Sequence, residues 1–420
     1  MRVLFVSSSF PTDLQTKVGG VYQRMRLFID AIKEFASLDM LFYAPAEVDV
    51  SPRARFSLEK SLSKYWQTSI RLSLCPRLQL KGEWSRWQLY GSPAFNFFQH
   101  PDYLQTSGLE QVETLERSLE NSPDVIFAHK LASMCPMMLT KTALPPVFFD
   151  LDDIEHVVVS RVLRQEPRWR VRLLHTARLP ALLWGEHRAI RSALRTFVCS
   201  ELDRKYLQHR WRLPGIVTIP NAISVPKMQP LTTDPTLLFI GSYLYQPNVD
   251  AAEFLISKVW PFVHQRMPAA RLIIAGHPPD RIRGYADDLP GVEFTGLVSN
   301  LDDLYHRSRV VCAPILSGGG TRVKIIEAAV YGKPVVATRL GAEGLDLRDG
   351  HELLLRDDTQ SFAESCVELL NDFSLCKKLG LAARDMAIQR YDRSEVVRLI
   401  QKHMTQSYGQ ELLAHELSNG

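Results

Sequence analysis

The sequence predicts an α/β protein of two domains, each with a parallel β-sheet covered by helices. Short apolar runs alternate with amphipathic stretches along the 420 residues, which is the pattern of repeated strand–helix–strand units. The runs form two series, which are separated by a proline-containing stretch without apolar periodicity, Ile223–Pro235. The length also exceeds that of one ordinary domain. We therefore expect one domain over residues 1–225 and a second over residues 226–390.

Each series supplies its own set of strands and helices. In the first series, strands are expected at Val3–Ser7, Met40–Tyr43, Val125–Ala128, Val147–Phe149, Thr196–Cys199 and Ile216–Ile219. In the second, they are expected at Leu237–Ile240, Leu272–Ala275, Val292–Phe294, Val310–Ala313 and Val335–Ala337. Helical patterns cover Val249–Arg266, Leu301–Arg307, Thr321–Tyr331, Phe362–Leu370, Leu375–Ile388 and Val396–Met404. Ligands of open parallel sheets bind at the carboxyl ends of the strands, so two facing sheets predict a ligand in the cleft between the domains.

Composition and charge exclude several classes of protein. Hydrophobic residues make up 45% of the chain and charged residues 23%, with a net charge of +4, which is ordinary globular composition and too weakly basic for a nucleic-acid binder. The six cysteines form no CxxC pair, which favours reduced thiols over disulfides or a zinc site. The first apolar run ends at three serines, and no later run approaches the roughly 18 apolar residues of a membrane span. We expect a soluble cytoplasmic protein, with peripheral attachment to the inner face of the membrane left open.

The stretch SGGGTRVKIIEAAVYGKPVVAT, Ser317–Thr338, predicts an anion site. It follows an expected strand, and its three glycines, Gly318, Gly319 and Gly320, give a flexible backbone whose N–H groups are able to surround an anion. Thr321 is the expected N-cap of the next helix, and a helix N-terminus attracts negative charge. Arg322 and Lys324 lie in the first turn, where cations oppose the helix dipole unless an anion is bound.

An alternative interpretation of this stretch needs no ligand. The glycines would then only form a tight turn, and Lys324 would pair with Glu327 at i,i+3. The GxxxxGK[ST] spacing of a Walker A loop is absent, which disfavours a nucleotide-hydrolysing motor.

With its continuation GAEGL, Gly341–Leu345, this stretch resembles the donor-binding core of the retaining glycosyltransferases of family 4, also called group 1, in the form with a GGGTR-K loop. The segments IPNAI, LLFIGSYLYQPNVDAAEFL, LIIAGHPP and GVEFTGLVSNLDDLY follow in the order of that family. The similarity covers most of Thr218–Asp392. The first half supports it more thinly, through VGGVYQR and DVIFAH.

The resemblance implies the GT-B fold, with two Rossmann-like domains whose parallel sheets face across a cleft, and a C-terminal helix, residues 391–420, that returns to the first domain. It implies transfer of a sugar from a nucleotide sugar, with retention, to the precursor of a polysaccharide or glycolipid. No cofactor is implied and no strictly required metal. Glu327 would bind the ribose hydroxyls. The remaining donor-binding positions that the resemblance implies are Gly19, Gly20, Gly241, Gly296, Leu297, Val298, Gly318, Gly319, Gly320 and Thr321.

The chain departs from the common family pattern at two places. Gly319 stands where most members have a glutamate that touches the donor sugar. Ser242 and the Pro247–Asn248 turn stand where most have an arginine and a lysine. Arg322 and Lys324 are therefore predicted to supply the missing positive charge and are predicted catalytic residues.

His129 closes the expected strand Val125–Ala128, at its carboxyl end. Alone, such a histidine is more often an ordinary surface or capping residue; in the family a histidine here contacts the donor sugar, so His129 is the third predicted catalytic residue. The cluster DLDDIEH, Asp150–His156, suits helix capping or the acceptor side of the cleft better than a metal.

The segment Val157–Arg195 holds nine arginines interleaved with leucine and tryptophan. It favours equally an anionic membrane surface as partner and a solvated helix face that packs its leucines on the domain.

Two other functions remain open from the sequence. One is a sugar-nucleotide epimerase or hydrolase on the same fold, which needs a proton-abstracting or water-activating carboxylate in the cleft. The other is a non-catalytic protein that binds sugar nucleotides, which the two departures motivate. A dehydrogenase is disfavoured because no GxGxxG follows either first strand.

Overall fold

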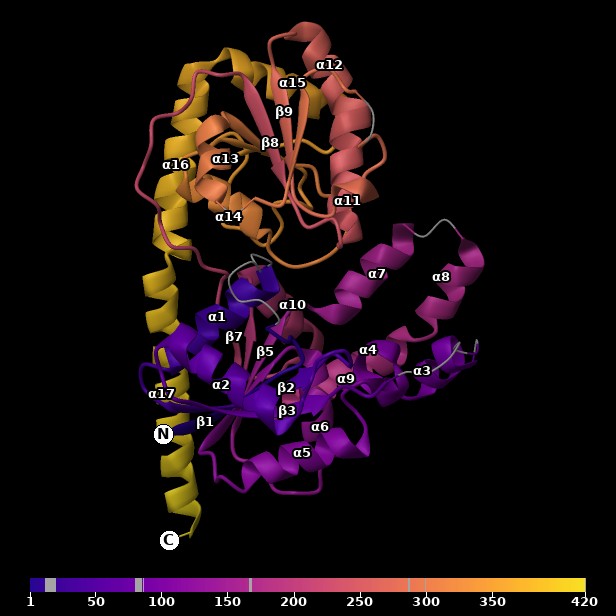
Figure 1. Cartoon of the computed structure of the whole chain (residues 1–420), viewed down its shortest axis with the longest axis vertical. Coiled ribbons are helices and arrows are strands. Elements are labelled where there is room, and N and C mark those ends of the chain that lie inside the picture. The colour runs from indigo at the N-terminus through magenta and orange to yellow at the C-terminus, as the bar shows by residue number, and fades with distance from the viewer. Residues whose placement is uncertain are drawn as a thin grey trace. The chain divides into compact units, whose positions relative to one another are not determined.

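The computed structural model of the chain describes residues 1–11, 20–79, 85, 87–165, 168–285, 288–298 and 300–419 (Figure 1). The chain divides into two compact units. Unit 1 consists of Met1–Ile219 and Val397–Gly420, and unit 2 of Pro220–Val396. The predicted α/β class with two parallel-sheet, Rossmann-like domains is confirmed.

The divisions lie close to the expected boundaries but do not coincide with them. The first falls before Pro220 rather than after residue 225, and the second after Val396 rather than after residue 390. The reason is a short pairing inside unit 2. The Ile223 N–H donates to the Tyr391 carbonyl at 2.9 Å, and the Arg393 N–H donates to the Ile223 carbonyl at 3.1 Å. The proline-rich stretch therefore begins within unit 2.

Unit 1 contains a seven-stranded, wholly parallel sheet in the order β3-β2-β1-β4-β5-β6-β7. The strands are β1 (Arg2–Ser7), β2 (Ser37–Ala44), β3 (Ile70–Pro76), β4 (Val125–His129), β5 (Val147–Asp152), β6 (Arg195–Val198) and β7 (Ile216–Thr218). The sequence did not predict β3, an edge strand that mixes buried and accessible side chains in a stretch with no continuous apolar run.

Helices cover both faces of this sheet. The helices of unit 1 are α1 (Gly20–Ile32), α2 (Pro52–Trp66), α3 (Ser92–Phe95), α4 (Pro101–Leu104), α5 (Leu109–Leu119), α6 (Leu131–Leu139), α7 (Glu155–Gln165), α8 (Trp169–Thr176), α9 (Leu179–Ser192), α10 (Glu201–Trp211) and, from Val397 on, α17 (Arg393–Asn419), with short turns η1 (Trp87–Gly91) and η2 (Phe97–Gln99). Phe28 of α1 packs on the Phe127 ring of β4 at 4.7 Å between centroids, on one face. Leucines and methionines of α5, α6 and α9 fill the core on the other face.

Unit 2 contains a six-stranded parallel sheet in the order β10-β9-β8-β11-β12-β13. The strands are β8 (Thr236–Ile240), β9 (Arg271–Ala275), β10 (Val292–Gly296), β11 (Val310–Ala313), β12 (Val335–Ala337) and β13 (Leu354–Leu355). The helices are α11 (Gln246–Phe254), α12 (Trp260–Arg266), α13 (Leu301–Arg307), α14 (Val323–Val330), α15 (Thr359–Asn371) and α16 (Phe373–Tyr391), with turns η3 (Leu255–Val259) and η4 (Pro279–Arg281). Helices α11, α12 and α15 cover one face, and α13 and α14 cover the other (Figure 1). Their apolar side chains form the core on each face.

The helix expected at Val249–Arg266 is interrupted. It splits into α11, the π-helical turn η3 and α12, and Pro261 lies at the start of α12. Proline has no N–H to donate to the preceding turn, which accounts for the break.

Both sheets have the same strand order, which reverses direction between β1 and β4 in unit 1 and between β8 and β11 in unit 2. These two switch points are the places where doubly wound sheets bind ligands. Among the described residues no helix combines the length and the apolarity that a membrane span requires. All six cysteines are buried free thiols.

Candidate active site

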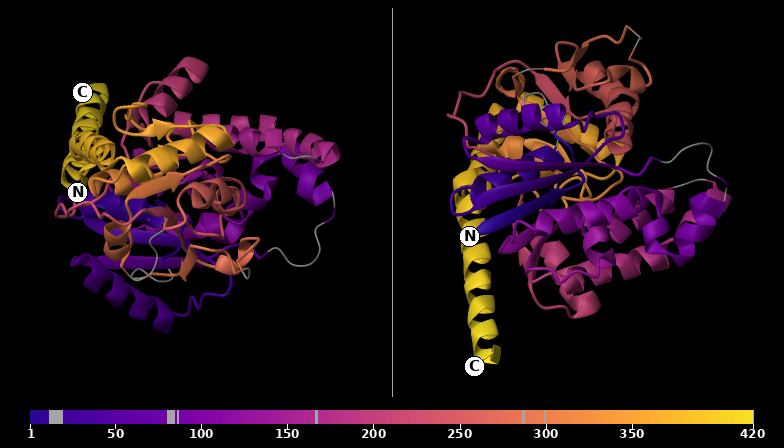
Figure 2. Two further views of the ribbon diagram at one scale, coloured as in Figure 1. Left: turned by 90° about the horizontal axis from the view of Figure 1, so that it is seen from above. Right: turned by 60° about the horizontal axis from the view of Figure 1, so that its bottom comes forward.

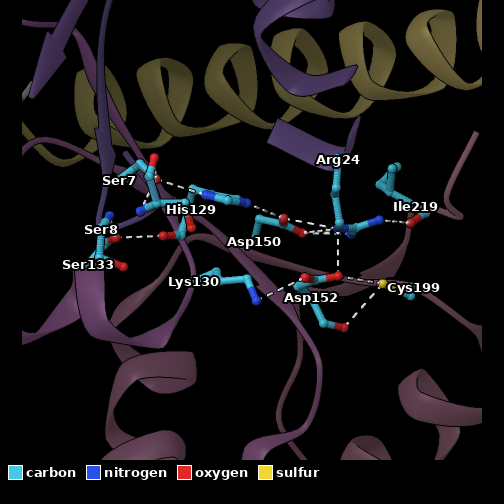
Figure 3. A network of polar contacts seen from close by, with 11 residues as sticks. Ser7, Ser8, Arg24, His129, Lys130, Ser133, Asp150, Asp152, Cys199 and Ile219 are labelled. Atoms are coloured by element: carbon cyan, nitrogen blue, oxygen red, sulfur yellow. Dashed lines mark hydrogen bonds and ion pairs between the residues drawn. The ribbon is translucent and has the colours of Figure 1, made fainter. Parts of the chain in front are cut away.

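The switch point of unit 1 joins Ser7, the last residue of β1, to His129, the last residue of β4 (Figure 3). The Ser7 Oγ lies 2.9 Å from the His129 Nδ1, and the His129 side chain is fully buried. Its Nε2 makes no hydrogen bond and lies 3.9 Å from the Asp150 carboxylate. Burial, together with Lys130 and Arg24, lowers the pKa of His129 to about 3, so the ring is neutral.

Beside His129, four charged side chains contact one another. The Arg24 guanidinium of α1 donates to both carboxylate oxygens of Asp150, with Nη2 to Oδ1 at 2.6 Å. Its Nη1 also donates to the Ile219 carbonyl at 2.9 Å. Asp152 lies 3.4 Å from Arg24 and 3.3 Å from the Lys130 ammonium. The two positive and two negative charges thus compensate one another inside unit 1 (Figure 3).

The two carboxyls of this network differ in their titration. Burial raises the pKa of Asp150 to about 6 despite the Arg24 charge. Burial would also raise that of Asp152, but Lys130 and Arg24 outweigh it and lower the pKa to about 2. Lys130 and Asp152 both have positive φ, 69° and 63°. Such strain in residues other than glycine persists only where surrounding contacts enforce it, and here the two strained residues pair with each other.

The end of the DLDDIEH cluster forms the start of α7, and its residues bond to α9 and α10. The Glu155 N–H donates to the Glu186 Oε1 at 2.8 Å, and His156 bonds Glu186 through Nδ1 and the Tyr206 hydroxyl through Nε2. Burial raises the pKa of Glu155 to about 8. No group of three or more metal-ligating side chains with suitable geometry occurs in the part of the chain that the structure describes.

The switch point of unit 2 contains the glycine-rich loop that follows β11. Gly318 and Gly320 have positive φ, 93° and 72°. The φ of Gly318 favours glycine, and a Cβ there would also lie 2.2 Å from the Tyr245 hydroxyl, which would have to move. The Arg322 guanidinium turns back onto the loop and donates to the carbonyl oxygens of Ser317 and Gly319. Arg322 therefore holds the loop's shape.

The helix after this loop begins two residues later than predicted. α14 starts at Val323 and its N-cap is Arg322, so the expected N-cap role of Thr321 is wrong. The Thr321 hydroxyl instead accepts a hydrogen bond from the Asn221 Nδ2 at 2.8 Å. Because the Thr321 hydroxyl bonds Asn221, it does not cap α14, and the first turn of this helix has no side-chain cap.

Lys324 lies in the first turn of α14 and is half-buried. Its Nζ donates to the Asn248 Oδ1 at 2.9 Å and lies 4.3 Å from the centroid of the Phe239 ring. No carboxylate of the described residues forms an ion pair with it, so the predicted alternative of a Lys324–Glu327 pair is not observed. Burial, and then the Arg322 charge, lowers the pKa of Lys324 to about 7, while Glu327 opposes the shift.

Glu327 is placed one turn further along α14. Its Oε2 accepts a hydrogen bond from the Tyr305 hydroxyl of α13 at 3.1 Å. The Tyr305 ring stacks on Tyr331, with centroids 4.4 Å apart. This stack fixes Tyr305, and Tyr305 in turn orients the carboxylate. Tyr305 was not among the predicted site residues, although it ends GVEFTGLVSNLDDLY, one of the segments that carry the resemblance.

The other predicted donor residues are distributed as follows. Gly296 ends β10 with φ of 65°, Leu297 is exposed, and Val298 packs partly on the core. Gly241 follows β8, and a Cβ there would lie 2.9 Å from the Asn248 Cγ. In unit 1, Gly20 is the first residue of α1, and Gly19 lies outside the described residues.

A cavity of about 460 Å³ opens in unit 1 beyond the carboxyl ends of β2 and β3. It is lined by Pro45, Ala46, Glu47, Arg77, Leu78, Gln79 and Gln105. Arg77 bonds the Tyr43 carbonyl at 3.1 Å and also the Ser8 carbonyl, so it links this cavity to the end of β1. The cavity therefore lies on the same edge of the sheet as Ser7 and His129.

Unit 2 has clear sequence similarity to known proteins. Residues 234–372 match the family described as Glycosyl transferases group 1. The chain is 28% identical over 253 residues to the phosphatidyl-myo-inositol mannosyltransferase of Mycobacterium tuberculosis. The aligned region covers 55% of this chain and 66% of that protein. The curated relatives that it matches are covered over about half to two thirds of their length.

Solved structures extend the similarity to the whole chain. Sucrose-phosphate synthase from Thermosynechococcus elongatus superposes with a TM-score of 0.70 at 16% identity, over 98% of this chain and 99% of the other. The chain has the GT-B fold. HepE of Anabaena, solved in complex with UDP and glucose, superposes with a TM-score of 0.62 at 15% identity, over 96% and 99%. The GT-B fold that the resemblance implied is thus confirmed.

Proposed function

We propose that this GT-B protein is a retaining glycosyltransferase that takes its sugar from a nucleoside-diphosphate sugar. One observation carries the proposal. The half-buried Lys324 ammonium, beside the glycine-rich loop at the unit 2 switch point, has no carboxylate partner among the described residues. A half-buried charge that forms no ion pair is costly, and Glu327 offsets this cost only in part, so a bound diphosphate would supply the missing counter-charge. The match of residues 234–372 to group 1 glycosyl transferases supports the same assignment.

The chemistry follows from this placement. Transfer needs a diphosphate leaving group whose negative charge grows as the bond to the sugar breaks. Lys324 and the backbone N–H groups at the start of α14 are prearranged to stabilise that charge, and Glu327 is placed to accept hydrogen bonds from ribose hydroxyls. Arg322 contributes by holding the loop through two carbonyl oxygens. His129 and Gly20 remain predicted donor contacts from unit 1, and no metal or other cofactor takes part in this scheme.

We further propose that the acceptor is a glycan or lipid-linked precursor of a polysaccharide or glycolipid. Two similar proteins support this class: one is a phosphatidyl-myo-inositol mannosyltransferase, and HepE was solved with glucose as well as UDP. The cavity beside β2 and β3 offers the polar side chains of Glu47, Arg77 and Gln105 to sugar hydroxyls.

Incubation with a panel of nucleotide sugars tests the function. We expect release of nucleoside diphosphate from one of them, greatly increased by a membrane extract that contains the acceptor, and lost in Lys324→Ala. Release that is independent of any acceptor would favour the hydrolase. Tight binding without release in any mixture would favour the non-catalytic binder.

The segment α7–α9 supports a peripheral location on an anionic membrane, at its cytoplasmic face. None of the α8 side chains is buried, and Trp169 and Leu173 are 61% and 63% exposed. Trp87 and Phe95 are exposed on the neighbouring η1 and α3, and Figures 1 and 2 place α3, α7 and α8 at one end of unit 1. Arg170 and Arg172 are also exposed on α8. Exposed aromatic and basic side chains together suit an anionic lipid surface, whereas a twofold contact with a second copy would bring the arginines face to face.

Co-sedimentation with vesicles measures this attachment. The protein should sediment with vesicles of phosphatidylglycerol and much less with phosphatidylcholine. Trp169→Ala/Leu173→Ala and Arg170→Gln/Arg172→Gln should each weaken the binding, the second by about 1 kcal/mol per cation. Lys377→Gln/Lys378→Gln removes the same charge from exposed positions in unit 2 and should bind as the wild type. Equal binding to both lipids, unchanged in the α8 variants, would contradict the proposal.

A further inference from the structure

We propose that Asn248 is a positioning residue that holds the Lys324 ammonium at the unit 2 switch point, so that one cation from α14 replaces the pair of cations expected after β8. This inference rests on the proposed donor site. Asn248 lies in the first turn of α11, which follows β8, and Lys324 lies in the first turn of α14, which follows β11. Because β8 and β11 flank the switch point, the bond between these two side chains spans the place where the sheet receives its ligand.

Both ends of the Asn248 amide are in use. Its Oδ1 accepts from the Lys324 Nζ at 2.9 Å, and its Nδ2 donates to the Ser242 carbonyl at 2.9 Å. The opposite orientation of the amide would place an NH2 group against an ammonium and an oxygen against a carbonyl. The chemistry of the two partners therefore fixes the amide, and the fixed amide gives the ammonium a defined position.

Gly241, Tyr245 and Phe239 surround the Asn248–Lys324 pair and restrict its position. A Cβ at Gly241 would lie 2.9 Å from the Asn248 Cγ and 3.0 Å from its Cβ, so Gly241 makes the room that this side chain occupies. The Asn248 N–H also bonds the Tyr245 carbonyl at 3.0 Å. On the other side, the Phe239 ring faces the ammonium at 4.3 Å from its centroid, an arrangement that favours the charged form of Lys324.

An amide suits this position better than a carboxylate. A neutral oxygen orients the ammonium through one hydrogen bond and leaves its charge and its other two N–H donors for an anion. An aspartate in the same place would neutralise the ammonium through an ion pair and repel a diphosphate. Ser242 and Pro247, which stand where the resemblance expects cations, carry no charge, so Lys324 is the positive side chain that Asn248 brings to this loop.

Binding of UDP and GDP, measured by titration calorimetry on the full chain, tests the inference. Asn248→Ala should weaken the affinity about 3- to 10-fold, as expected for the loss of one orienting hydrogen bond. Asn248→Asp, which has nearly the same shape, should weaken it more, by about 10- to 100-fold, because the carboxylate neutralises the ammonium and repels the diphosphate. It should also flatten the dependence of affinity on pH between 7 and 9, since the new carboxylate keeps Lys324 charged throughout. Thermal unfolding should show Asn248→Asp to be folded.

The matched control is Gln265→Glu, which adds the same negative charge at an exposed position of α12 and should bind UDP and GDP as the wild type. If Asn248 served only the packing of α11, Asn248→Asp would bind like the wild type with an unchanged pH profile, and that result would overturn the inference. Lys324→Ala distinguishes a failure of the donor site from a failure of the positioning role alone. If Lys324→Ala retains the affinity of the wild type, the donor site itself is wrong. If it loses affinity while both Asn248 variants keep it, only the positioning role fails.

Discussion

The two switch points have the same strand order but treat charge in opposite ways. In unit 1, the cations Arg24 and Lys130 form ion pairs with Asp150 and Asp152. In unit 2, Lys324 is held by a neutral amide, and Arg322 bonds backbone carbonyl oxygens. Compensated charges of the first kind fix the ends of strands and helices, whereas a cation of the second kind is available to a ligand. Within this chain, the pairing of the charges at a site indicates whether the site is structural or binds a ligand. The number of charged residues is a poorer indicator.

The largest effect should come from breaking the compensated network. Arg24→Met removes one partner of a fully buried ion pair and should lower the free energy of unfolding by about 3–5 kcal/mol. Denaturant unfolding followed by circular dichroism measures it. Arg26→Met, two residues along the same helix, removes an exposed arginine paired with Asp30 and should cost about 0–1 kcal/mol. Equal losses in the two variants would remove the distinction between a scaffold network and a surface pair.

The second prediction concerns the ribose end of the donor site. Glu327→Ala should weaken UDP or GDP binding by about 1.5–3 kcal/mol, because a charged hydrogen-bond acceptor is lost. The binding of inorganic pyrophosphate should not change, since it has no ribose. Calorimetric titration with both ligands makes the comparison. An equal loss for pyrophosphate would mean that Glu327 acts on the phosphates or on the loop instead.

The third prediction is a dependence of donor affinity on pH. Lys324 has a pKa of about 7 in the free protein, below its usual 10.5. A bound diphosphate favours the charged form, so binding takes up a proton above pH 7, and affinity should fall as the pH rises, by about 3- to 10-fold per unit. The window of pH 7 to 9 lies above the titration of the terminal phosphate. In Lys324→Met the affinity should be lower and should not vary over this window; a slope that persists there would assign the proton to another group.

The smallest effect should be that of Lys324 on stability. Because its pKa is lower in the folded protein, the unfolded chain binds more protons between pH 7 and 10.5, and the free energy of unfolding should rise with pH across this window. Lys324→Met removes the unfavourable burial of the ammonium charge. At pH 7 it should therefore leave the free energy of unfolding unchanged or raise it by less than about 1 kcal/mol. A clear destabilisation would place Lys324 with the structural charges of unit 1.

The sequence predicted the fold well because apolar runs and helical periodicity reflect burial directly, and β4, β11 and α13 were located almost to the residue. It failed where burial is partial, as in the edge strand β3, and where a local hydrogen bond decides a boundary, as at Thr321 and Val323. The partners of site residues were beyond it for a different reason. Asn248 lies 76 positions from Lys324, and Arg24 lies 126 positions from Asp150. No periodicity links residues that only the parallel topology brings together.

The division of the chain determines the order in which its parts are completed during synthesis. Unit 2 is one continuous stretch, Pro220–Val396, inserted between two parts of unit 1. The final part carries Ile400 and Met404, both fully buried, and the Gln401 side chain bonds the Ala31 carbonyl of α1 at 3.2 Å. During synthesis, unit 1 is therefore begun before unit 2 and completed after it. Unit 2 is able to fold before α17 is made and packs on unit 1.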